Sequence, residues 1–206
     1  EAARTAGLCS MGAKVIPLGV VPTPAVAYLT RYYKADAGVV ISASHNPCEY
    51  NGIKFFNSDG YKLSDGIENE IESYILGEKA IEELPTHGKV GYVSANHNAV
   101  EDYVAFAVST IDCRLDGMKI AVDCANGASY ETAFKALNKL GANVEAIHNT
   151  PDGVNINHMC GSTHMESLQA YVTSIGADIG IAFDGDADRM LAVDENGKLI
   201  DGDQIM

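Results

Sequence analysis

Apolar residues recur along the chain in two alternating patterns. Short apolar runs predict buried strands, and the stretches between them carry an apolar residue every three or four positions, as one face of a helix does. The predicted strands span residues 14–18, 37–43, 53–57, 118–123, 143–147 and 178–183. Asn196-Gly197 predicts a hairpin between residues 190–194 and 198–200. The predicted helices span residues 2–11, 23–34, 100–111, 129–140 and 164–174.

Helix starts are marked by capping signals. Two pairs of residues have the spacing of a capping box: Asp65 with Glu68, and Thr163 with Glu166. The first pair predicts a further helix, whose buried face would hold the isoleucines at positions 67, 71 and 75. The alternation of strands and helices predicts an α/β fold, organised as two consecutive α/β domains with mixed, largely parallel sheets flanked by helices.

One stretch interrupts this alternation. Residues 77–97 have weak periodicity and contain Pro85, Gly88 and Gly91, so we expect a linker at residues 85–97. The linker would separate a domain at residues 1–84 from a second domain at residues 98–201. Residues 202–206 would begin a third domain. The chain has no initiator Met and no terminating pattern, so we interpret it as an excerpt of a longer protein.

Composition and charge narrow the function classes. The chain has 206 residues, of which 47% are hydrophobic and 20% charged, and a formal charge of −14. That charge argues against nucleic acid as a partner. No apolar run approaches the ~20 residues that cross a bilayer, so no membrane span is expected. The five cysteines lack CxxC spacing, which argues against a zinc site or a disulfide framework and favours the cytoplasm.

The most informative segment is an acidic loop directly after the predicted strand at residues 178–183. It places Asp184, Asp186 and Asp188 at alternate positions, at the carboxyl end of the strand, where open α/β sheets bind ligands. Adjacent carboxylates repel one another unless a cation lies among them, and oxygen-only ligands suit Mg²⁺ or Ca²⁺. We expect Gly185 to let the backbone turn tightly enough for the carboxylates to converge.

Three other interpretations of this loop compete with a metal site of this kind. A solvent-exposed acidic turn is the simplest. An EF-hand matches the positions of the aspartates and of Glu195, but it requires Gly where Arg189 stands, and the flanking segments are predicted strands. A phosphatase that uses Asp184 as an aspartyl nucleophile is the more serious alternative, and only the neighbouring serine loop argues against it.

The serine loop is Ser42-Ala-Ser-His-Asn-Pro47, which also follows an apolar strand. A serine released from a strand into a loop can carry a phosphoryl group when a metal neutralises its charge. The alternative is a capped turn with His45 as a structural, hydrogen-bonded histidine. A Ser-His pair alone is a weak hydrolase signal, and the chain has no G-x-S-x-G elbow to support one.

Together, the segments ISASHNP, NGIKFF and FDGDADR resemble the alpha-D-phosphohexomutase family. The resemblance implies that Ser44 is phosphorylated. It implies one Mg²⁺ per chain, held by a phosphate oxygen on Ser44 and by the carboxylates of Asp184, Asp186 and Asp188. Residues 1–84 would then be the family's first domain, incomplete at its start, and residues 98–201 its second.

The resemblance also implies roles for three further residues. Arg189 would contact the phosphate, Lys54 would assist proton transfer, and His45, beside the serine, is the remaining catalytic candidate. The alternative for Lys54 is a solvated lysine at a strand edge. Two departures from the family pattern, Cys48 and Ala187, remove no ligand. The family's N-terminal motif, third-domain sugar loop and fourth-domain phosphate loop are absent.

A last pair of segments, PDGVNIN and CGSTHME, resembles the branch of the family that acts on glucosamine phosphates. The implied reaction interconverts glucosamine 6-phosphate and glucosamine 1-phosphate through a sugar bisphosphate, which would also serve as activator. Within these segments Asn155, Asn157, Ser162 and His164 are expected to be structural, and Cys160 a packed thiol. Implied partners are a hexosamine phosphate and the missing C-terminal domains, and a homo-oligomer is compatible with the sequence.

Alternative functions stay open at this point. They are a phosphomannomutase or phosphoglucomutase, a metal-dependent phosphatase of the aspartyl-phosphate type, and a non-catalytic module that binds a sugar phosphate or a cation. The chain by itself is expected to be inactive as a mutase.

Overall fold

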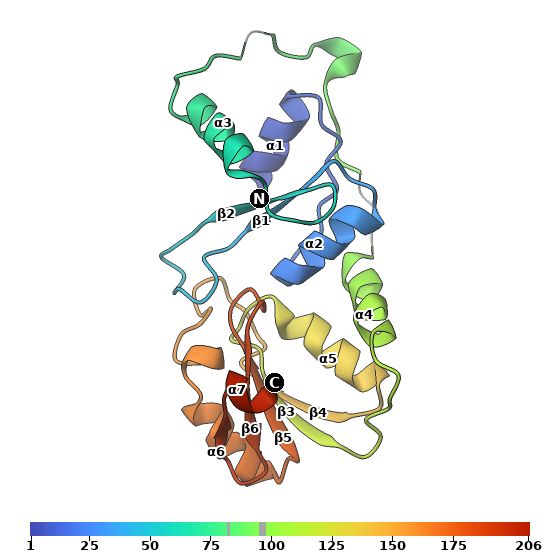
Figure 1. Cartoon of the computed structure of the whole chain (residues 1–206), viewed down its shortest axis with the longest axis vertical. Coiled ribbons are helices and arrows are strands. Elements are labelled where there is room, and N and C mark those ends of the chain that lie inside the picture. The colour runs from blue at the N-terminus through green and yellow to red at the C-terminus, as the bar shows by residue number, and fades with distance from the viewer. Residues whose placement is uncertain (82, 95–97) are drawn as a thin grey trace.

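The computed structural model describes residues 1–81, 83–94 and 98–206, and these form a mixed α/β fold in two parts (Figure 1). The helices are α1 (Ala2–Ser10), α2 (Thr23–Tyr32), α3 (Asp65–Ile75), α4 (Ala99–Ser109), α5 (Ser129–Lys139), α6 (Glu166–Ile175) and α7 (Gly202–Ile205), with 3₁₀ turns η1 (His87–Lys89) and η2 (Gly161–Thr163). The strands are β1 (Ala37–Ile41), β2 (Ile53–Asn57), β3 (Lys119–Asp123), β4 (Asn143–Ile147), β5 (Ile179–Phe183), β6 (Met190–Asp194) and β7 (Leu199–Ile200). The predicted α/β fold class is confirmed.

The first part is built on an antiparallel pair, β1 and β2, in which Val39 lies opposite Phe55. Helix α2 packs on this pair and supplies most of the buried apolar side chains of a small core, to which Val21 and the first residue of α4 also belong. The members of that core are Val21, Ala25, Val26, Leu29 and Ala99. Helices α1 and α3 lie at the end of the molecule that faces away from the second part (Figure 1). They bury no residue.

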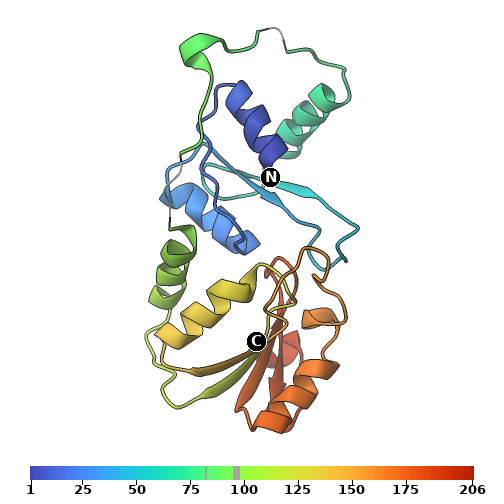
Figure 2. The same ribbon diagram turned by 180° about the vertical axis from the view of Figure 1, so that it is seen from behind.

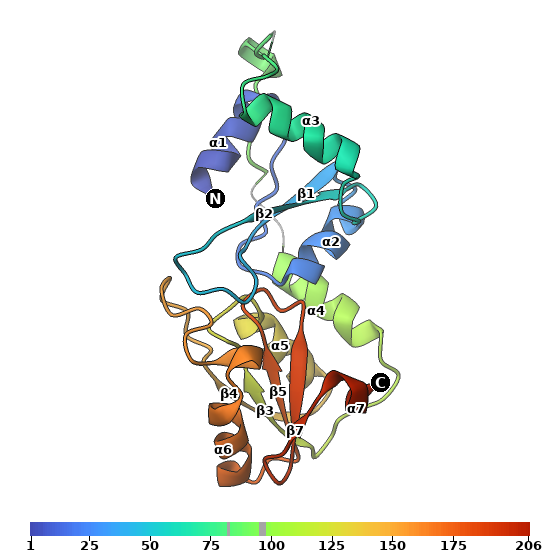
Figure 3. The ribbon, with the colours of Figure 1, turned by 60° about the vertical axis from the view of Figure 1, so that its left-hand side comes forward.

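The second part is a five-stranded sheet in the order β4-β3-β5-β6-β7. Strands β4, β3 and β5 are parallel, so their carboxyl ends meet at one edge, whereas β6 and β7 pair antiparallel. Helices α5 and α6 cover opposite faces of the sheet (Figure 3). Alternate residues of β3 serve the two faces: Ala121 packs with α6, and Ile120 and Val122 pack with α5.

Helix α4 connects the two parts. It packs against α2 on one side and against α5 on the other, as the reverse view shows (Figure 2). Phe106 of α4 stacks on Tyr28 of α2 with ring centroids 3.8 Å apart. On its other side, Glu101 receives Lys135 and Lys139 of α5 at 2.7 and 2.9 Å. The predicted division near residue 98 therefore falls just before a helix that contacts both parts, and residues 95–97 of the predicted linker lie outside the described residues.

Two sequence predictions in the first part are wrong. Residues 14–18 form only one bridge, from Val15 to Val93, because Pro17 lacks the N–H that a continued ladder needs. Asp65 does not cap α3. Ser64 is the N-cap, no side chain caps the helix, and the Glu68 carboxylate pairs with Lys62 at 3.2 Å instead.

Two further expectations about helix faces and caps also fail. The expected buried face of α3 is not buried: Ile67 and Ile75 are exposed at 48% and 74%, and Ile71 is only half-buried. Thr163 does not cap α6, which begins at Glu166, because Thr163 ends η2 and its hydroxyl contacts His164 Nδ1 at 3.2 Å. Among the described residues, none of the helices combines the length and the apolar character that spanning a bilayer requires.

Candidate phosphoserine and metal site

The serine loop leaves β1 and returns to β2 as a closed turn. Its ends are joined by a hydrogen bond from Ser42 N to the Gly52 carbonyl at 3.0 Å. Inside the loop, Ser44 N donates to Ser42 Oγ at 2.8 Å, and Asn46 Nδ2 donates to the Ala43 carbonyl at 3.0 Å. Ser44 has a positive φ of 55°, which is uncommon for a residue with a Cβ. The loop therefore holds Ser44 in a conformation that it would rarely adopt alone.

The acidic loop connects β5 to β6. Asp184 and Asp186 are buried at 1% and 3% exposure, whereas Asp188 is exposed. One carboxylate oxygen from each of the three aspartates lies within 4.8 Å of the others, as a shared cation requires. The left-handed turn falls on Ala187, with φ 54°, and not on Gly185. Our expectation that Gly185 serves the turn is wrong.

The serine and acidic loops meet where the two parts of the molecule face each other. Ser44 Oγ donates a hydrogen bond of 2.9 Å to Asp184 Oδ2, across 140 residues of sequence. In Figure 1, the loop between β1 and β2 reaches down to the upper end of the second sheet. The predicted phosphoryl carrier and the predicted metal ligands thus share one site.

Two residues of the first part contact the second aspartate. Lys54 Nζ lies 2.7 Å from Asp186 Oδ2 and 3.4 Å from Asp188 Oδ2. Thr23, at the start of α2, donates its hydroxyl to the same Asp186 oxygen at 2.7 Å, and its N–H to the Asp186 carbonyl at 2.9 Å. The side chain of Lys54 is 37% exposed on the edge strand β2, but its ammonium group is paired with the acidic loop. Sequence reasoning missed Thr23, for which the only signal was its place at a helix start.

Burial and charge set the ionisation of these groups. Burial raises the pKa of Asp184, and the neighbouring carboxylates raise it further, against the hydrogen bond from Ser44. Burial also acts to raise the pKa of Asp186, but the hydrogen bonds from Lys54 and Thr23 outweigh it, and the net shift is downward. For Lys54, burial acts to lower the pKa, but its bonds to Asp186 and Asp188 outweigh that effect and raise it. Lys54 is thus held as an ammonium ion.

The donor set fits a hard divalent cation. All three candidate ligands are carboxylates, which is the chemistry that Mg²⁺ prefers. Asp186 Oδ1 is buried and has no hydrogen-bond partner among the described residues, so one acceptor in the group is free to bind a cation. The other oxygen, Oδ2, is occupied by Lys54 and Thr23. The Lys54 ammonium therefore stands in for part of the positive charge that the carboxylates require.

Arg189 and His45 lie on the rim of the site. Arg189 Nη1 is 3.2 Å from His45 Nδ1, and Arg189 Nε is 3.7 Å from Asp188 Oδ1. Because a guanidinium can only donate, His45 Nδ1 is the acceptor in this contact. The Arg189 N–H also donates to Asp184 Oδ1 at 3.2 Å, so the same residue closes the acidic loop.

Comparison with known proteins decides the family. Residues 1–82 match the sequence profile described as phosphoglucomutase/phosphomannomutase, alpha/beta/alpha domain I, and residues 99–197 match the profile for domain II. The chain belongs to the phosphoglucomutase/phosphomannomutase family. The resemblance seen in the serine and acidic loops is confirmed.

Relatives within this family are close in sequence. The phosphoglucosamine mutase of Acetivibrio thermocellus is 63% identical over 206 residues, covering 100% of this chain and 46% of that protein. The phosphoglucosamine mutase of Ruminiclostridium cellulolyticum is 62% identical with the same coverage. The chain therefore spans about half the length of the curated relatives it matches.

Solved structures show the same fold. A phosphoglucomutase/phosphomannomutase family protein of Burkholderia thailandensis superposes with a TM-score of 0.76 at 28% identity, covering 94% of this chain and 43% of that one. A candidate phosphomannomutase of Thermus thermophilus superposes with a TM-score of 0.77 at 24% identity, covering 98% and 47%.

In this phosphohexomutase chain the predicted site residues come together in one place. Ser44 and Lys54 contact the acidic loop directly, and His45 and Arg189 contact each other beside it. Their catalytic roles, and the binding of metal by the aspartates, stay predictions.

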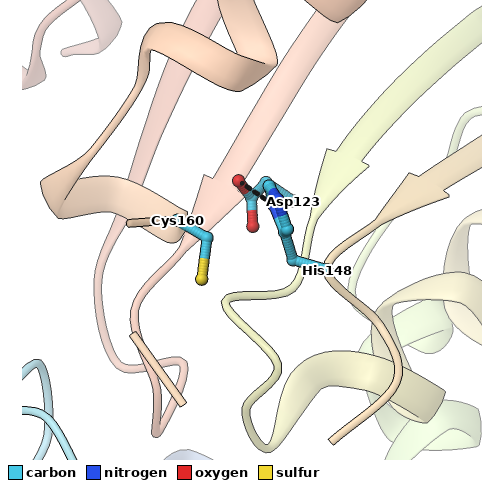
Figure 4. A group of neighbouring side chains, drawn as sticks. All are labelled: Asp123, His148 and Cys160. Atoms are coloured by element: carbon cyan, nitrogen blue, oxygen red, sulfur yellow. Dashed lines mark hydrogen bonds and ion pairs between the residues drawn. The ribbon is translucent and has the colours of Figure 1, made fainter. Parts of the chain in front are cut away.

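A second polar cluster lies at the carboxyl ends of β3 and β4, and sequence reasoning missed it (Figure 4). Asp123 is fully buried. Its Oδ1 accepts Ala125 N at 2.8 Å, and its Oδ2 accepts Gly161 N at 3.0 Å and faces His148 Nδ1 at 2.9 Å. Cys160 completes a group that can in principle hold a metal, but both Asp123 oxygens already have donors. The available signal was that the strand KIAVD ends in aspartate, as IGIAFD does.

Proposed function

We propose that this chain is the phosphoryl-carrying half of a phosphohexomutase that interconverts glucosamine 6-phosphate and glucosamine 1-phosphate. The observation that carries the proposal is the contact between Ser44 Oγ and Asp184 Oδ2 at 2.9 Å. It supports Ser44 as the carrier, because the hydroxyl lies against the group of carboxylates best suited to a cation. The choice of sugar is supported by relatives at 63% and 62% identity that are named phosphoglucosamine mutase.

In this proposal Asp184, Asp186 and Asp188 hold one Mg²⁺. The ion, when bound, would neutralise negative charge on the transferring phosphoryl group. The chain's own residues do the rest. The acidic loop places its carboxylates beside Ser44, and Arg189 adds a permanent positive charge next to His45 and Asp188. A few placed cations would thereby serve a negatively charged substrate inside a chain with a formal charge of −14.

The reaction would consist of two transfers, each of a different phosphoryl group. The P–O bond to Ser44 breaks while a P–O bond to the free sugar hydroxyl forms, which gives a sugar bisphosphate. After the bisphosphate turns round, Ser44 Oγ takes the other phosphoryl group. Such transfers depend mainly on positioning and on charge neutralisation. We also propose that a sugar bisphosphate loads Ser44 at the start.

Proton transfer at the sugar hydroxyl is the step for which Lys54 was predicted. In the present arrangement its ammonium is bonded to Asp186 and Asp188, which raises its pKa. To accept a proton, Lys54 must first leave Asp186 and lose its own. We therefore propose that Lys54 acts first as a cation of the site, and as a proton carrier only after substrate displaces it.

Recognition of the sugar's distal phosphate is assigned to the half of the protein that the curated relatives have and this chain does not span. Correct orientation of two reactants can supply ~7–11 kcal/mol of barrier reduction, so its absence would abolish turnover.

All five cysteines are free thiols, which fits an enzyme of a reducing cytoplasm.

The experiment is to incubate the chain with Mg²⁺ and glucosamine 1,6-bisphosphate, and to map any covalent phosphate by peptide mass spectrometry. We expect one phosphoryl group on Ser44 that resists hydroxylamine, and none in the Ser44→Ala variant. Phosphate on Asp184, labile to hydroxylamine, would instead identify an aspartyl phosphatase. Metal binding without covalent phosphate would identify a non-catalytic module.

A further inference from the structure

The segment between β4 and η2, residues 148–160, contacts both the serine loop and Asp123. We infer that Asn157 in this segment is a positioning residue for phosphoryl transfer. Its side-chain amide holds the Ser44 backbone where the hydroxyl meets Asp184, and Asp123 anchors the segment that carries it. The inference rests on the proposed role of Ser44 as phosphoryl carrier.

Both N–H groups of the Asn157 side-chain amide donate hydrogen bonds to the serine loop. Nδ2 donates to the carbonyl oxygens of Ser44 and Asn46, each at 2.9 Å, across more than a hundred residues of sequence. Asn157 is buried at 5% exposure, and its Oδ1 has no partner among the described residues. A buried acceptor without a partner is costly, so the orientation of this amide is set by its two bonds to the serine loop.

Those bonds act on the strained residue of that loop. Ser44 has φ 55°, a conformation that persists for a residue with a Cβ only when its surroundings hold it. Its N–H is held by Ser42 Oγ from within the loop, whereas its carbonyl is held by Asn157 from the other part of the molecule. Loss of the Asn157 bonds would free the peptide after Ser44 to rotate, and would move Oγ away from Asp184.

The segment that carries Asn157 is itself fixed at several points. Asn157 N donates to the Ala125 carbonyl at 2.9 Å. The Asp123 carboxylate contacts His148 at the start of the segment and Gly161 just beyond Cys160, so one buried group holds both ends. Non-glycine residues with positive φ gather on this segment and on the loop after β3: Ala125, Asn126, His148, Asn157 and Met159. Such clustering indicates that the surroundings impose this backbone shape.

Gly185 makes the close approach feasible. A Cβ on Gly185 would lie 2.5 Å from Asn157 Nδ2 and 2.7 Å from the Ser44 carbonyl oxygen. Asn157, Ser44 and the acidic loop therefore pack as one unit, in which any shift of the amide is passed to the serine that faces Asp184.

The test compares Asn157→Asp and Asn157→Ala with a matched control in the same segment, Asn155→Asp. Asn157→Asp keeps the shape and removes the donors, and Asn157→Ala keeps the test valid if the first variant does not fold. Among the described residues, the side chain of Asn155 makes its hydrogen bonds inside its own segment, to the Thr150 carbonyl and from Asp152 N. Two quantities are measured on the whole chain: hydrogen exchange of a peptide covering residues 42–50, and the rate of Ser44 phosphorylation by glucosamine 1,6-bisphosphate with Mg²⁺.

We expect both Asn157 variants to exchange about tenfold faster in residues 42–50, while residues 119–123 exchange as before. The maximal rate of Ser44 phosphorylation should fall about 100-fold, with little change in the bisphosphate concentration for half-maximal rate. Asn155→Asp should match the unchanged chain in both. Unchanged exchange, or faster exchange with an unchanged phosphorylation rate, overturns the inference. If the unchanged chain is never phosphorylated, the proposed function fails, and with it the role of Asn157 in transfer.

Discussion

Gly185 and Ala187 stand two residues apart in the acidic loop and have opposite requirements. A Cβ on Gly185 would meet Asn157 and Ser44, whereas Ala187 already carries a Cβ in a left-handed conformation. We predict that Gly185→Ala lowers the free energy of unfolding by about 1–3 kcal/mol, because both neighbours are held by hydrogen bonds. Ala187→Gly should be neutral or stabilising by up to ~1 kcal/mol.

Urea denaturation of the two variants measures both effects under the same conditions. If Gly185→Ala leaves the free energy of unfolding unchanged, or if Ala187→Gly lowers it as much as Gly185→Ala does, then close approach and backbone strain do not distinguish these positions. Each variant is a control for the other, because both changes are made in the acidic loop and one adds the methyl group that the other removes.

Lys54 would compete with a bound cation for the carboxylates of Asp186 and Asp188. Lys54 Nζ occupies Asp186 Oδ2 and approaches Asp188, so its removal frees an acceptor and withdraws a positive charge. We predict that Lys54→Met raises the affinity of the unphosphorylated chain for Mg²⁺ about tenfold, as isothermal titration would measure it. Lys62→Met is the matched control, because Lys62 pairs with Glu68 in a different part of the molecule. Equal or weaker binding by Lys54→Met would show that Lys54 does not compete.

At the scale of elements, the Asp123 carboxylate joins the ends of β3 and β4 to the segment before η2. It is fully buried and accepts two backbone N–H groups beside its contact with His148. We predict that Asp123→Ala lowers the free energy of unfolding by about 3 kcal/mol, because these donors would be left buried without an acceptor. Asp178→Ala is the control. Asp178 also accepts a backbone N–H, from Lys119 at 2.7 Å, but it is exposed and should cost less than ~1 kcal/mol. Similar losses in both variants would contradict this account.

The elements of the second part could be predicted from sequence because each is a continuous local pattern. The strand at residues 143–147 was predicted with its observed bounds, and the run before Asp184 with a difference of one residue. The capping box at Asp65 failed because Ser64, one residue earlier, is the N-cap, and the Glu68 carboxylate pairs with Lys62 outside the helix. The spacing of two residues does not fix where a helix begins.

The residues of the candidate site also differ in whether a local sequence pattern could predict them. The aspartates and Ser44 were predicted because their loops follow apolar runs and because the motifs in these loops resemble a known family, and both features are visible within a dozen residues of sequence. Thr23 and Asn157 were not assigned to the site, because their partners lie 163 and 113 residues away. Their roles follow only from the way the two parts of the chain are packed together.

At the scale of the whole molecule, the first part presents apolar side chains to solvent. On and beside α3, Ile67, Ile75 and Leu76 are exposed at 48%, 74% and 71%. Large apolar side chains exposed in this way promote association. We predict that the apparent mass in light scattering rises with concentration, and that the double variant Ile75→Ser with Leu76→Ser reduces the rise. A concentration-independent monomer mass would contradict this prediction.

The central claim is that this chain supplies the phosphoryl carrier and the metal ligands of a mutase, but not the residues that bind the distal phosphate of the sugar. The direct measurement is the initial rate of conversion of glucosamine 6-phosphate to glucosamine 1-phosphate, with Mg²⁺ and a bisphosphate activator. It is made on the chain alone and on the chain fused to the remaining half of the Acetivibrio thermocellus relative. The account predicts turnover by the fusion, none by the chain alone, and none by the fusion with Ser44→Ala. Turnover by the chain alone, or by the Ser44→Ala fusion, would contradict it.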